Sequence, residues 1–224
     1  MTPSFAIEIH KRLIDYYGVP IWRKPLPALD ELISTILSQN TNDKNRDIAY
    51  NQLKARFSSW SMVREADTQS IVEAIRPAGL ANQKGKRIKA ILQKILPVPN
   101  KGEANDGETL SFLKTMEVEE ARKWLLQFNG VGPKTAAIVL LFSLGMPAFP
   151  VDTHIYRVSG RLGLRPKELN VEQTHHYLES LFEKEAYAAV HLNLIYLGRE
   201  LCKARQVLCE QCPLQDLCDF VKSK

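Results

Sequence analysis

The segment "FNGVGPKTAAIVLLF", residues 128–142, decides the fold. Gly130 and Gly132 stand in a turn that leads directly into an apolar helix, and Lys134 lies where this helix begins. Glycine permits positive φ and leaves no side chain in the way of a close backbone approach. The first N–H groups of a helix are unpaired and its dipole is positive at that end, so such a turn can hold an anion. The segment predicts helix, phosphate-binding turn and helix within residues 115–144; an ordinary connector between antiparallel helices is the alternative.

The rest of the sequence is also helical in its periodicity. Apolar residues recur every three or four positions in 29–36 and 121–128, as they do on one face of a helix. Asn170 is placed to cap the start of a helix and Gly198 to end one. Residues 97–109, "PVPNKGEANDGET", predict a loop. No run of alternating strands and no solenoid repeat is present, so the predicted fold class is all-α.

Composition excludes some classes of protein and leaves a nucleic-acid partner open. The chain has 224 residues, 45% of them hydrophobic, which suits one large domain or two small ones. No apolar run reaches the roughly 18–20 residues of a membrane helix, and the N-terminal residues have no apolar signal core. We therefore expect a cytoplasmic protein, nucleoid-associated if bacterial. The net charge of +5 and the pI of about 9.0 are compatible with a polyanionic partner.

All four cysteines lie close to the C-terminus, in the pattern C-x6-C-x2-C-x5-C: Cys202, Cys209, Cys212 and Cys218. Disulfide frameworks usually spread along a small secreted chain, so this clustering favours a metal site in a reducing compartment. Zinc modules usually carry two separated C-x2-C pairs, and here there is one. The spacing disfavours a zinc ribbon but does not choose the metal.

Three segments, in this order, resemble the endonuclease III family of DNA repair glycosylases. The stretch "NGVGPKTA" resembles the helix–hairpin–helix element of these enzymes, although Asn129 stands where proline is usual. The stretch "VDTHIYRVSGRLG", residues 151–163, resembles their V-D-T-H segment, and the cysteine spacing matches their iron–sulfur loop. The resemblance covers roughly residues 27–219.

This resemblance implies a helix–hairpin–helix DNA glycosylase fold, with two helical domains and a cleft between them. Residues 28–143 would form a helical barrel that contains the hairpin at about 120–144. Residues 1–27 plus 144–224 would form the second domain, in which the four cysteines hold a [4Fe–4S] cluster. We expect the cluster to be structural and to orient the DNA.

The resemblance assigns catalysis to Lys134 and Asp152. A neutral amine can attack the sugar C1′, displace a base and form a Schiff base, which permits β-elimination. A carboxylate can stabilise the positive charge that develops on the sugar. Taken alone, a lysine at a helix start is usually a solvated charge, and an aspartate before Thr-His-Ile is usually an N-cap. Asp152 can serve both purposes.

The DNA-binding residues are also assigned by resemblance. Gly130, Val131 and Gly132 form the hairpin turn, and a glycosylase must fill the gap that an extruded nucleotide leaves. Gln39 and Asn40 are the candidate polar fillers, and the choice between them stays open.

Further contacts follow from the second loop and the C-terminal half. Leu80 is the candidate apolar wedge, with a core leucine as the alternative. The cluster of Lys84, Lys86 and Arg87 is either a phosphate-facing strip or an exposed helix face. His154, Lys203 and Arg205 are further candidate contacts to the DNA backbone.

The predicted function is that of a bifunctional DNA glycosylase and AP lyase. It would remove a damaged pyrimidine, an oxidised one by resemblance, from double-stranded DNA and nick the strand at the abasic site. We expect a monomer with no membrane partner. A mismatch thymine or uracil glycosylase and a non-catalytic DNA-binding module are the alternatives, with a structural zinc protein as a third.

Overall fold

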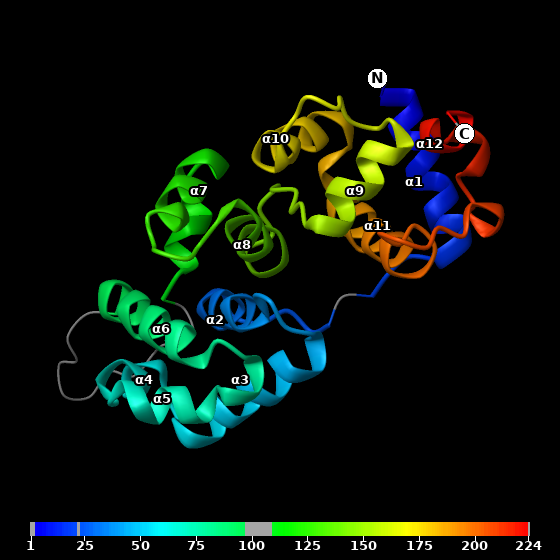
Figure 1. The fold of residues 1–224 in the computed structure, drawn as a ribbon. Coiled ribbons are helices and arrows are strands. Elements are labelled where there is room, and N and C mark those ends of the chain that lie inside the picture. Colours follow the sequence, from blue (N-terminus) through cyan, green and yellow to red (C-terminus); the bar gives the residue numbers. More distant parts are fainter. Residues whose placement is uncertain (1–2, 22, 97–108, 224) are drawn as a thin grey trace. The chain divides into compact units, whose positions relative to one another are not determined.

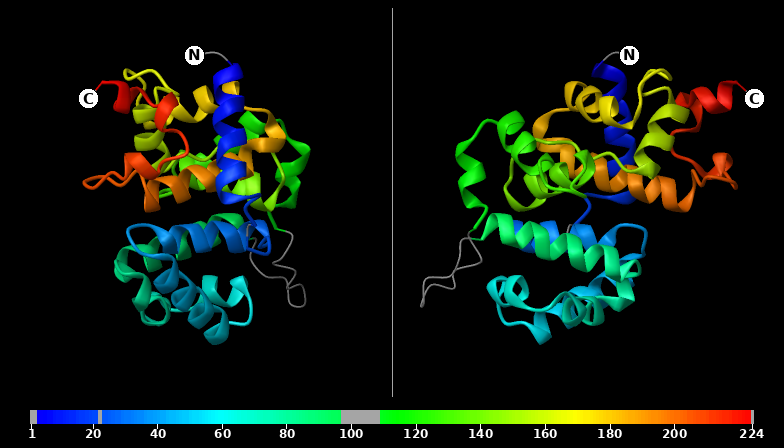
Figure 2. Two further views of the ribbon diagram at one scale, coloured as in Figure 1. Left: turned by 90° about the vertical axis from the view of Figure 1, so that its right-hand side faces the viewer. Right: turned by 60° about the vertical axis from the view of Figure 1, so that its left-hand side comes forward.

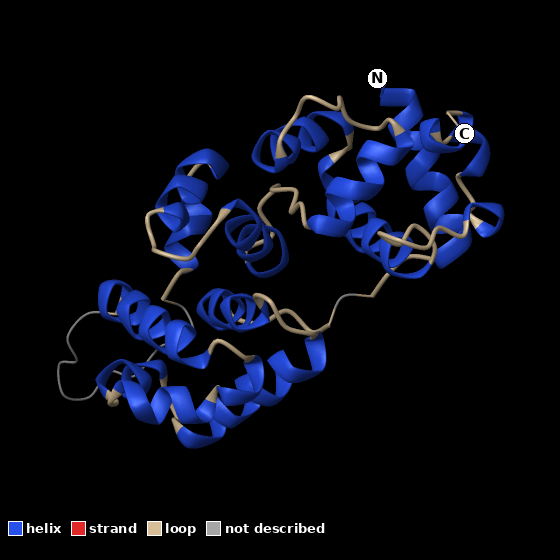
Figure 3. Ribbon diagram, viewed as in Figure 1, coloured by secondary structure: helices blue, strands red, loops and turns tan. Residues whose placement is uncertain are grey.

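The computed structural model describes residues 3–21, 23–96 and 109–223, and every absence stated below refers to these residues. They are helices joined by loops (Figure 3), and no sheet is formed; a single antiparallel bridge pairs Cys202 with Val207. The all-α prediction is confirmed. The loop predicted at 97–109 lies outside the described residues except for Thr109.

The chain divides into two compact units. The continuous unit comprises Pro25–Leu144, and the two-segment unit joins Met1–Lys24 to Gly145–Lys224. Each unit has its own buried apolar residues, so each is described separately.

The continuous unit is built around one buried helix. Its helices, labelled in Figure 1, are α2 (Ala28–Ser38), α3 (Asp43–Arg56), α4 (Trp60–Glu65), α5 (Thr68–Ala74), α6 (Ala81–Ile95), α7 (Val118–Leu126) and α8 (Pro133–Ile138), with the 3-10 turns η1 (Arg76–Ala78) and η3 (Ser111–Thr115) and the π-helical turn η4 (Val139–Ser143). The helices α3, α6 and α8 all contact α2, which is buried from Ala28 to Leu37.

A buried carboxylate on α2 is paired rather than left isolated. Asp30 accepts a hydrogen bond from Trp60 Nε1 at 2.9 Å and lies 3.3 Å from Lys54 Nζ. A buried charge is tolerated when it is hydrogen-bonded and paired. Asp30 therefore ties α2 to α3 and α4.

The two-segment unit brings both ends of the chain together. Its helices are α1 (Pro3–Tyr17), α9 (Thr153–Leu162), α10 (Val171–Leu181), α11 (Tyr187–Glu200) and α12 (Asp219–Lys222), with the 3-10 turns η5 (Lys184–Ala186), η6 (Cys209–Gln211) and η7 (Gln215–Leu217). The helix α11 packs against both α1 and α9 (Figure 2). Arg12 of α1 forms a 2.6 Å ion pair with Asp216, close to the last two cysteines.

Side-chain caps begin several of the helices, and one predicted helix end is not observed. Asn170 caps α10 in a full capping box with Gln173, as predicted. The prediction that a helix ends at Gly198 is wrong, because α11 continues to Glu200. A Cβ at Gly198 would lie 2.9 Å from the Cβ of His154, so this glycine allows α11 to approach α9 closely. No helix in the described part of the chain combines the length and apolar character needed to cross a bilayer.

Candidate functional site

The hairpin turn lies between α7 and α8, and its two glycines differ. Gly130 has φ of +86°, a conformation that favours glycine, whereas Gly132 is the N-cap of α8 with φ of −96°. A Cβ at Gly132 would meet no atom within 4 Å. Positive φ is therefore needed at Gly130 alone, and Gly132 keeps open space beside the start of the helix. Val131 is buried, and its N–H donates to Phe128 O at 3.0 Å, which closes the turn.

Lys134 occupies the first turn of α8 and its side chain is exposed. The next residues along this helix, Thr135 and Ala136, are buried, so the helix is anchored directly beside the lysine. The helix then widens into the π-helical turn η4, a rare form that is often found near functional sites.

Two loops of the same unit each carry a residue in the left-handed region. Within the described residues, Asn40 with φ of +53° and Leu80 with φ of +48° are the non-glycine residues with positive φ. Strained conformations of this kind persist only where the surroundings hold them, and they gather at functional sites. Asn40 is exposed, and the Leu80 side chain is 54% exposed. The interpretation of Leu80 as a core leucine is therefore wrong.

Gln39 differs from its neighbour Asn40, because both ends of its side chain are hydrogen-bonded within the unit. Its Nε2 donates to Gly130 O at 3.0 Å, and its Oε1 accepts from Arg87 Nη1 at 2.7 Å. Gln39 therefore joins the loop after α2 to the hairpin turn and to α6. Asn40 is the exposed member of the pair.

The cluster of Lys84, Lys86 and Arg87 does not form one exposed strip. Lys84 is 1% exposed, and its Nζ donates to Leu37 O at 2.7 Å and to Ala78 O at 2.8 Å. Burial, with a smaller effect from Arg87, lowers the pKa of Lys84 to about 8. Both sequence interpretations of this cluster are therefore wrong for Lys84, whose buried amine joins the last turn of α2 to the 3-10 turn η1.

The other two members of the cluster have separate environments. Arg87 is half-buried and Lys86 is exposed. Both line a groove beside the hairpin turn, together with Lys94 and Asn129. The exposed amines of Lys86 and Lys94 favour a phosphate backbone as the neighbour of this groove, whereas Arg87 is hydrogen-bonded to Gln39.

In the two-segment unit, Asp152 is the N-cap of α9. Its Oδ1 accepts a hydrogen bond from the backbone N–H of Ile155 at 2.8 Å, and its side chain is half-buried. The capping expected from the sequence is confirmed. His154 lies on the first turn of the same helix, where Nδ1 is 3.2 Å from Nη2 of Arg157.

The segment that leads to Asp152 is held by two histidines that the sequence analysis left out. Nδ1 of His175 lies 2.8 Å from Phe149 O, and Nδ1 of His191 lies 2.9 Å from Pro150 O. A carbonyl oxygen only accepts, so Nδ1 carries the hydrogen in each ring. Both histidines are buried and act on the backbone. Since a single histidine within a helix looks like any other buried residue, the sequence carries no signal for this role.

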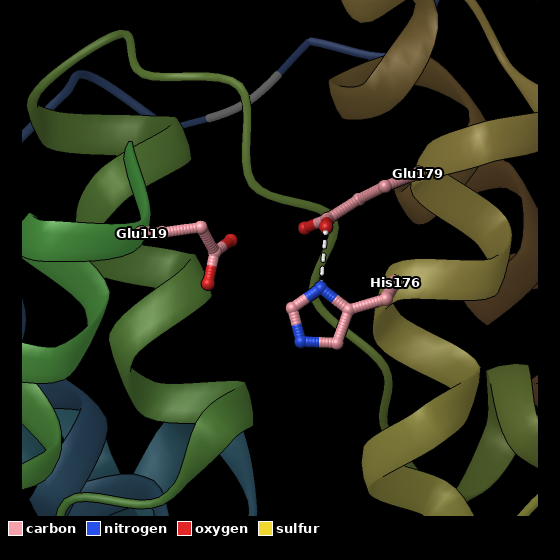
Figure 4. Close-up of side chains that lie close together, drawn as sticks. All are labelled: Glu119, His176 and Glu179. Carbon is pink, nitrogen blue, oxygen red and sulfur yellow. Dashed lines mark ion pairs between the residues drawn. The ribbon is translucent and has the colours of Figure 1, made fainter. Parts of the chain in front are cut away.

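A carboxylate on α10 completes this support. Glu179 accepts from the N–H of Phe149 at 2.7 Å and forms a 3.3 Å ion pair with His176 (Figure 4). The backbone immediately before Asp152 is thus fixed by α10 and α11.

The four cysteines line one cavity and form no disulfide. The pKa of the Cys212 thiol is raised to about 11, mainly by burial and to a smaller extent by the other three cysteines. Burial also raises the pKa of Cys218. Four thiols gathered around one cavity are suited to a positively charged metal centre, because such a centre stabilises the thiolate form.

The loop between the first two cysteines is held by an arginine that the sequence analysis missed. Nη1 of Arg161 donates to Cys202 Sγ at 3.3 Å and to Lys203 O at 2.7 Å, and its Nη2 donates to Ala204 O at 3.1 Å. Lys203 and Arg205 are exposed on this loop.

A second arginine of α9 binds the same loop. Arg157 donates to Cys202 O at 3.0 Å from Nε and to Gly198 O at 2.8 Å from Nη2. The available sequence signal was the spacing of four between Arg157 and Arg161, which places two guanidinium groups on one face of a helix.

Comparison with known proteins agrees with these features. The pattern of the HhH-GPD superfamily of base excision DNA repair proteins matches residues 33–184. Endonuclease III of Sulfolobus acidocaldarius is 34% identical over 191 residues, which covers 84% of this chain and 80% of the relative. Endonuclease III of Thermotoga maritima is 33% identical and covers 100% of this chain and 95% of the relative.

A solved structure of a trapped covalent endonuclease III–DNA intermediate is also similar. It has a TM-score of 0.79 at 25% identity and covers 100% of this chain and 98% of that chain. The chain therefore belongs to the HhH-GPD superfamily, as a base excision repair DNA glycosylase of the endonuclease III family.

Proposed function

We propose that this glycosylase is bifunctional: it removes a damaged pyrimidine, an oxidised one, from double-stranded DNA and then nicks the strand through a Schiff base on Lys134. The observation that carries the proposal is the placement of Lys134. It is an exposed amine on the first turn of a helix anchored by buried neighbours, two residues after a glycine that leaves open space.

The chemistry of Lys134 follows from its amine. The neutral amine attacks C1′ of the sugar, and the base departs with the electrons of the glycosidic bond and takes up a proton. The adduct then opens to a Schiff base. Loss of a 2′ proton from the Schiff base expels the 3′ phosphate, which breaks the strand.

Asp152 supplies the carboxylate that stabilises positive charge on the sugar. Its Oδ1 is used for the cap of α9, and a carboxylate has a second oxygen with free acceptor capacity. His175, His191 and Glu179 bond the backbone of Phe149 and Pro150, and this support limits the movement of the carboxylate that follows.

Asn40 and Leu80 are the residues that fill the gap in the duplex. Both side chains are exposed, and both backbones are held at positive φ by their loops. Polar and apolar fillers suit the two needs of an opened base pair, hydrogen bonding to the estranged base and stacking between bases. Gln39 is excluded from this role in our proposal, since its amide is bonded at both ends.

A [4Fe–4S] cluster bound by Cys202, Cys209, Cys212 and Cys218 fits the cavity they line. A single tetrahedral zinc ion, with Zn–S bonds of about 2.3 Å, would hold its four sulfurs closer together. Among the described residues no three of these sulfurs lie within 4.8 Å of one another, which suits separate irons. The cluster would supply a rigid support for the loop that carries Lys203 and Arg205.

Borohydride trapping on duplexes with one thymine glycol or one abasic site tests the proposal. We expect a covalent adduct on both duplexes, its loss in Lys134→Ala, and its retention in Lys86→Ala, which removes another exposed lysine of the same unit. An adduct on the abasic duplex alone would support the lyase but reject the oxidised-pyrimidine substrate, and a panel with mismatched thymine and uracil would follow.

Two other outcomes would reject larger parts of the proposal. No adduct on either duplex, with DNA binding intact, would indicate a DNA-binding module without this chemistry. Iron, sulfide and zinc analysis of the purified protein tests the cofactor, and one zinc per chain without iron would overturn it.

A further inference from the structure

We infer that Arg87 and Gln39 form a positioning pair, which fixes the hairpin turn to the loop that carries Asn40. The pair would make backbone binding and gap filling depend on each other, and so determine how strongly the enzyme prefers damaged over intact DNA. This inference rests on the proposed function.

The first support is the direction of the two hydrogen bonds of Gln39. Its Nε2 is the donor to Gly130 O, and its Oε1 is the acceptor for Arg87 Nη1. The partners lie 91 and 48 residues away in the chain, so these bonds join separate elements. The amide orientation is fixed by partners of opposite kind, because a carbonyl accepts and a guanidinium donates.

The second support is the packing of Arg87 against the hairpin turn. A Cβ at Gly130 would overlap the guanidinium group of Arg87. Glycine is therefore needed at position 130 for two reasons: its positive φ and the space that the Arg87 side chain occupies. Arg87 belongs to α6, the helix whose N-cap is Leu80. Its guanidinium therefore connects α6 to the loop that carries Asn40 and to the hairpin turn.

The third support is a parallel tie deeper in the unit. The buried Nζ of Lys84 joins Leu37 O to Ala78 O, shortly before Asn40 and Leu80 respectively. These two bonds join the ends of α2 and η1, from which the loops with Asn40 and Leu80 begin. The Arg87–Gln39 pair adds the connection to the hairpin that Lys84 does not make.

Removal of a positioning side chain and removal of a phosphate contact have different effects on DNA affinity. A cation that neutralises a phosphate contributes to all DNA alike, and its loss makes the salt dependence of binding shallower. A pair that aligns two elements contributes mainly where both elements are engaged, that is, on a duplex with a gap to fill.

The experiment measures the affinity of the full chain for two duplexes, one with a tetrahydrofuran abasic analogue and one intact, over a range of salt concentrations. The variants are Gln39→Ala, Arg87→Ala and the double variant. Lys86→Ala is the matched control, since it removes one charge from an exposed position next to Arg87. Thermal unfolding of each variant verifies that it is folded.

We expect each single variant to lower the ratio of the two affinities by about tenfold, the effect of losing one hydrogen bond to a charged group. The double variant should fall no further than the single ones, because both break the same connection. The salt slope of Arg87→Ala should equal that of the wild type. Lys86→Ala, which removes a candidate phosphate contact, should weaken binding to both duplexes alike and so keep the wild-type ratio.

Three results would overturn the inference: an unchanged ratio in the single variants, additive losses in the double variant, or a parallel loss on both duplexes with a shallower salt slope in Arg87→Ala. If an alanine variant does not fold, Gln39→Glu and Arg87→Met replace the pair. Gln39→Glu keeps the shape but has no donor for Gly130 O, and Arg87→Met keeps an unbranched chain but has no donor for Gln39 Oε1. A wild-type chain that forms no borohydride adduct and shows no preference for the abasic analogue would instead reject the proposed function itself.

Discussion

Arg161, in the last turn of α9, donates a hydrogen bond to the sulfur of Cys202 across 3.3 Å. The same guanidinium holds the carbonyl oxygens of Lys203 and Ala204 and lies over the ring of Phe220 at 5.0 Å from its centre. One side chain therefore connects a thiol of the cysteine cavity to the exposed loop and to α12. A ligand's hydrogen-bond partners commonly tune the metal site it belongs to.

If the four cysteines hold the proposed cluster, replacement of Arg161 by glutamine should make that cluster labile. We expect loss of visible absorption in the presence of a chelator to be about tenfold faster than in the wild type, because supporting residues of this kind affect metal retention to that extent. Arg205→Ala is the control, since it removes a charge from the same loop at an exposed position. Equal decay rates in the two variants would show that the bond to Cys202 has no part in retention.

Two substitutions of Asp152 distinguish its capping of α9 from its proposed role in catalysis. Asp152→Ala removes the cap of α9 and should lower the free energy of unfolding by about 1 kcal/mol, whereas Asp152→Asn keeps a capping oxygen and should stay within about 0.5 kcal/mol. Both variants should lose base excision, since neither carries a carboxylate. Urea unfolding and single-turnover excision measure the two effects, and an active Asp152→Asn would refute the electrostatic role.

The two hairpin glycines should respond differently to alanine. Gly130→Ala forces a Cβ into a left-handed residue and displaces Arg87, so we expect a loss of about 1–2 kcal/mol in unfolding free energy. Gly132→Ala meets no atom and needs no unusual φ, so stability should change by less than about 0.5 kcal/mol. DNA affinity should fall in both variants. Full DNA affinity in Gly132→Ala would exclude a close approach of DNA there.

Lys84 should give stability a distinctive dependence on pH. Its pKa is about 8 in the folded protein, against 10.5 for an ordinary lysine. Between these values the unfolded chain binds a proton that the folded chain lacks, so the free energy of unfolding rises with pH. Below pH 8 both states are protonated and the contribution is constant.

Urea unfolding of the wild type and of Lys84→Met from pH 7 to pH 10 measures this contribution. The difference between the two proteins should be constant below about pH 8 and move in favour of the wild type above it. Lys86→Met, at an exposed position of the same helix, should give a difference that does not change with pH. If the unfolding free energies of the wild type and Lys84→Met changed in parallel over this pH range, the lowered pKa of Lys84 would be contradicted.

The features that sequence analysis predicted correctly depend on neighbours in the chain. The caps at Asp152 and Asn170 need only the next three residues, and the helical faces need only a period of three to four. The hairpin turn was recognisable because glycine, proline and the apolar helix follow one another within a few positions.

The features that it missed depend on partners far along the chain. The choice between Gln39 and Asn40 is decided by Gly130 and Arg87, which no local pattern connects to residue 39. Lys84 was taken with its basic neighbours because a lysine is usually exposed, and its two carbonyl partners belong to other elements. Gly198 was read as a helix end, although the approach of His154 gives it a different purpose.

The two-segment unit has a consequence for the order in which the protein is made. Its helix α1 is translated before the continuous unit, whereas α11 and Asp216, which α1 contacts, are translated after it. The continuous unit Pro25–Leu144 is complete long before that and can fold on its own, as domains do during translation. The apolar face of α1, with Ala6, Ile9 and Leu13, must wait uncovered through most of synthesis. The cysteine cavity is thus assembled only after the continuous unit has been made, and the four thiols can bind a metal together only from that point on.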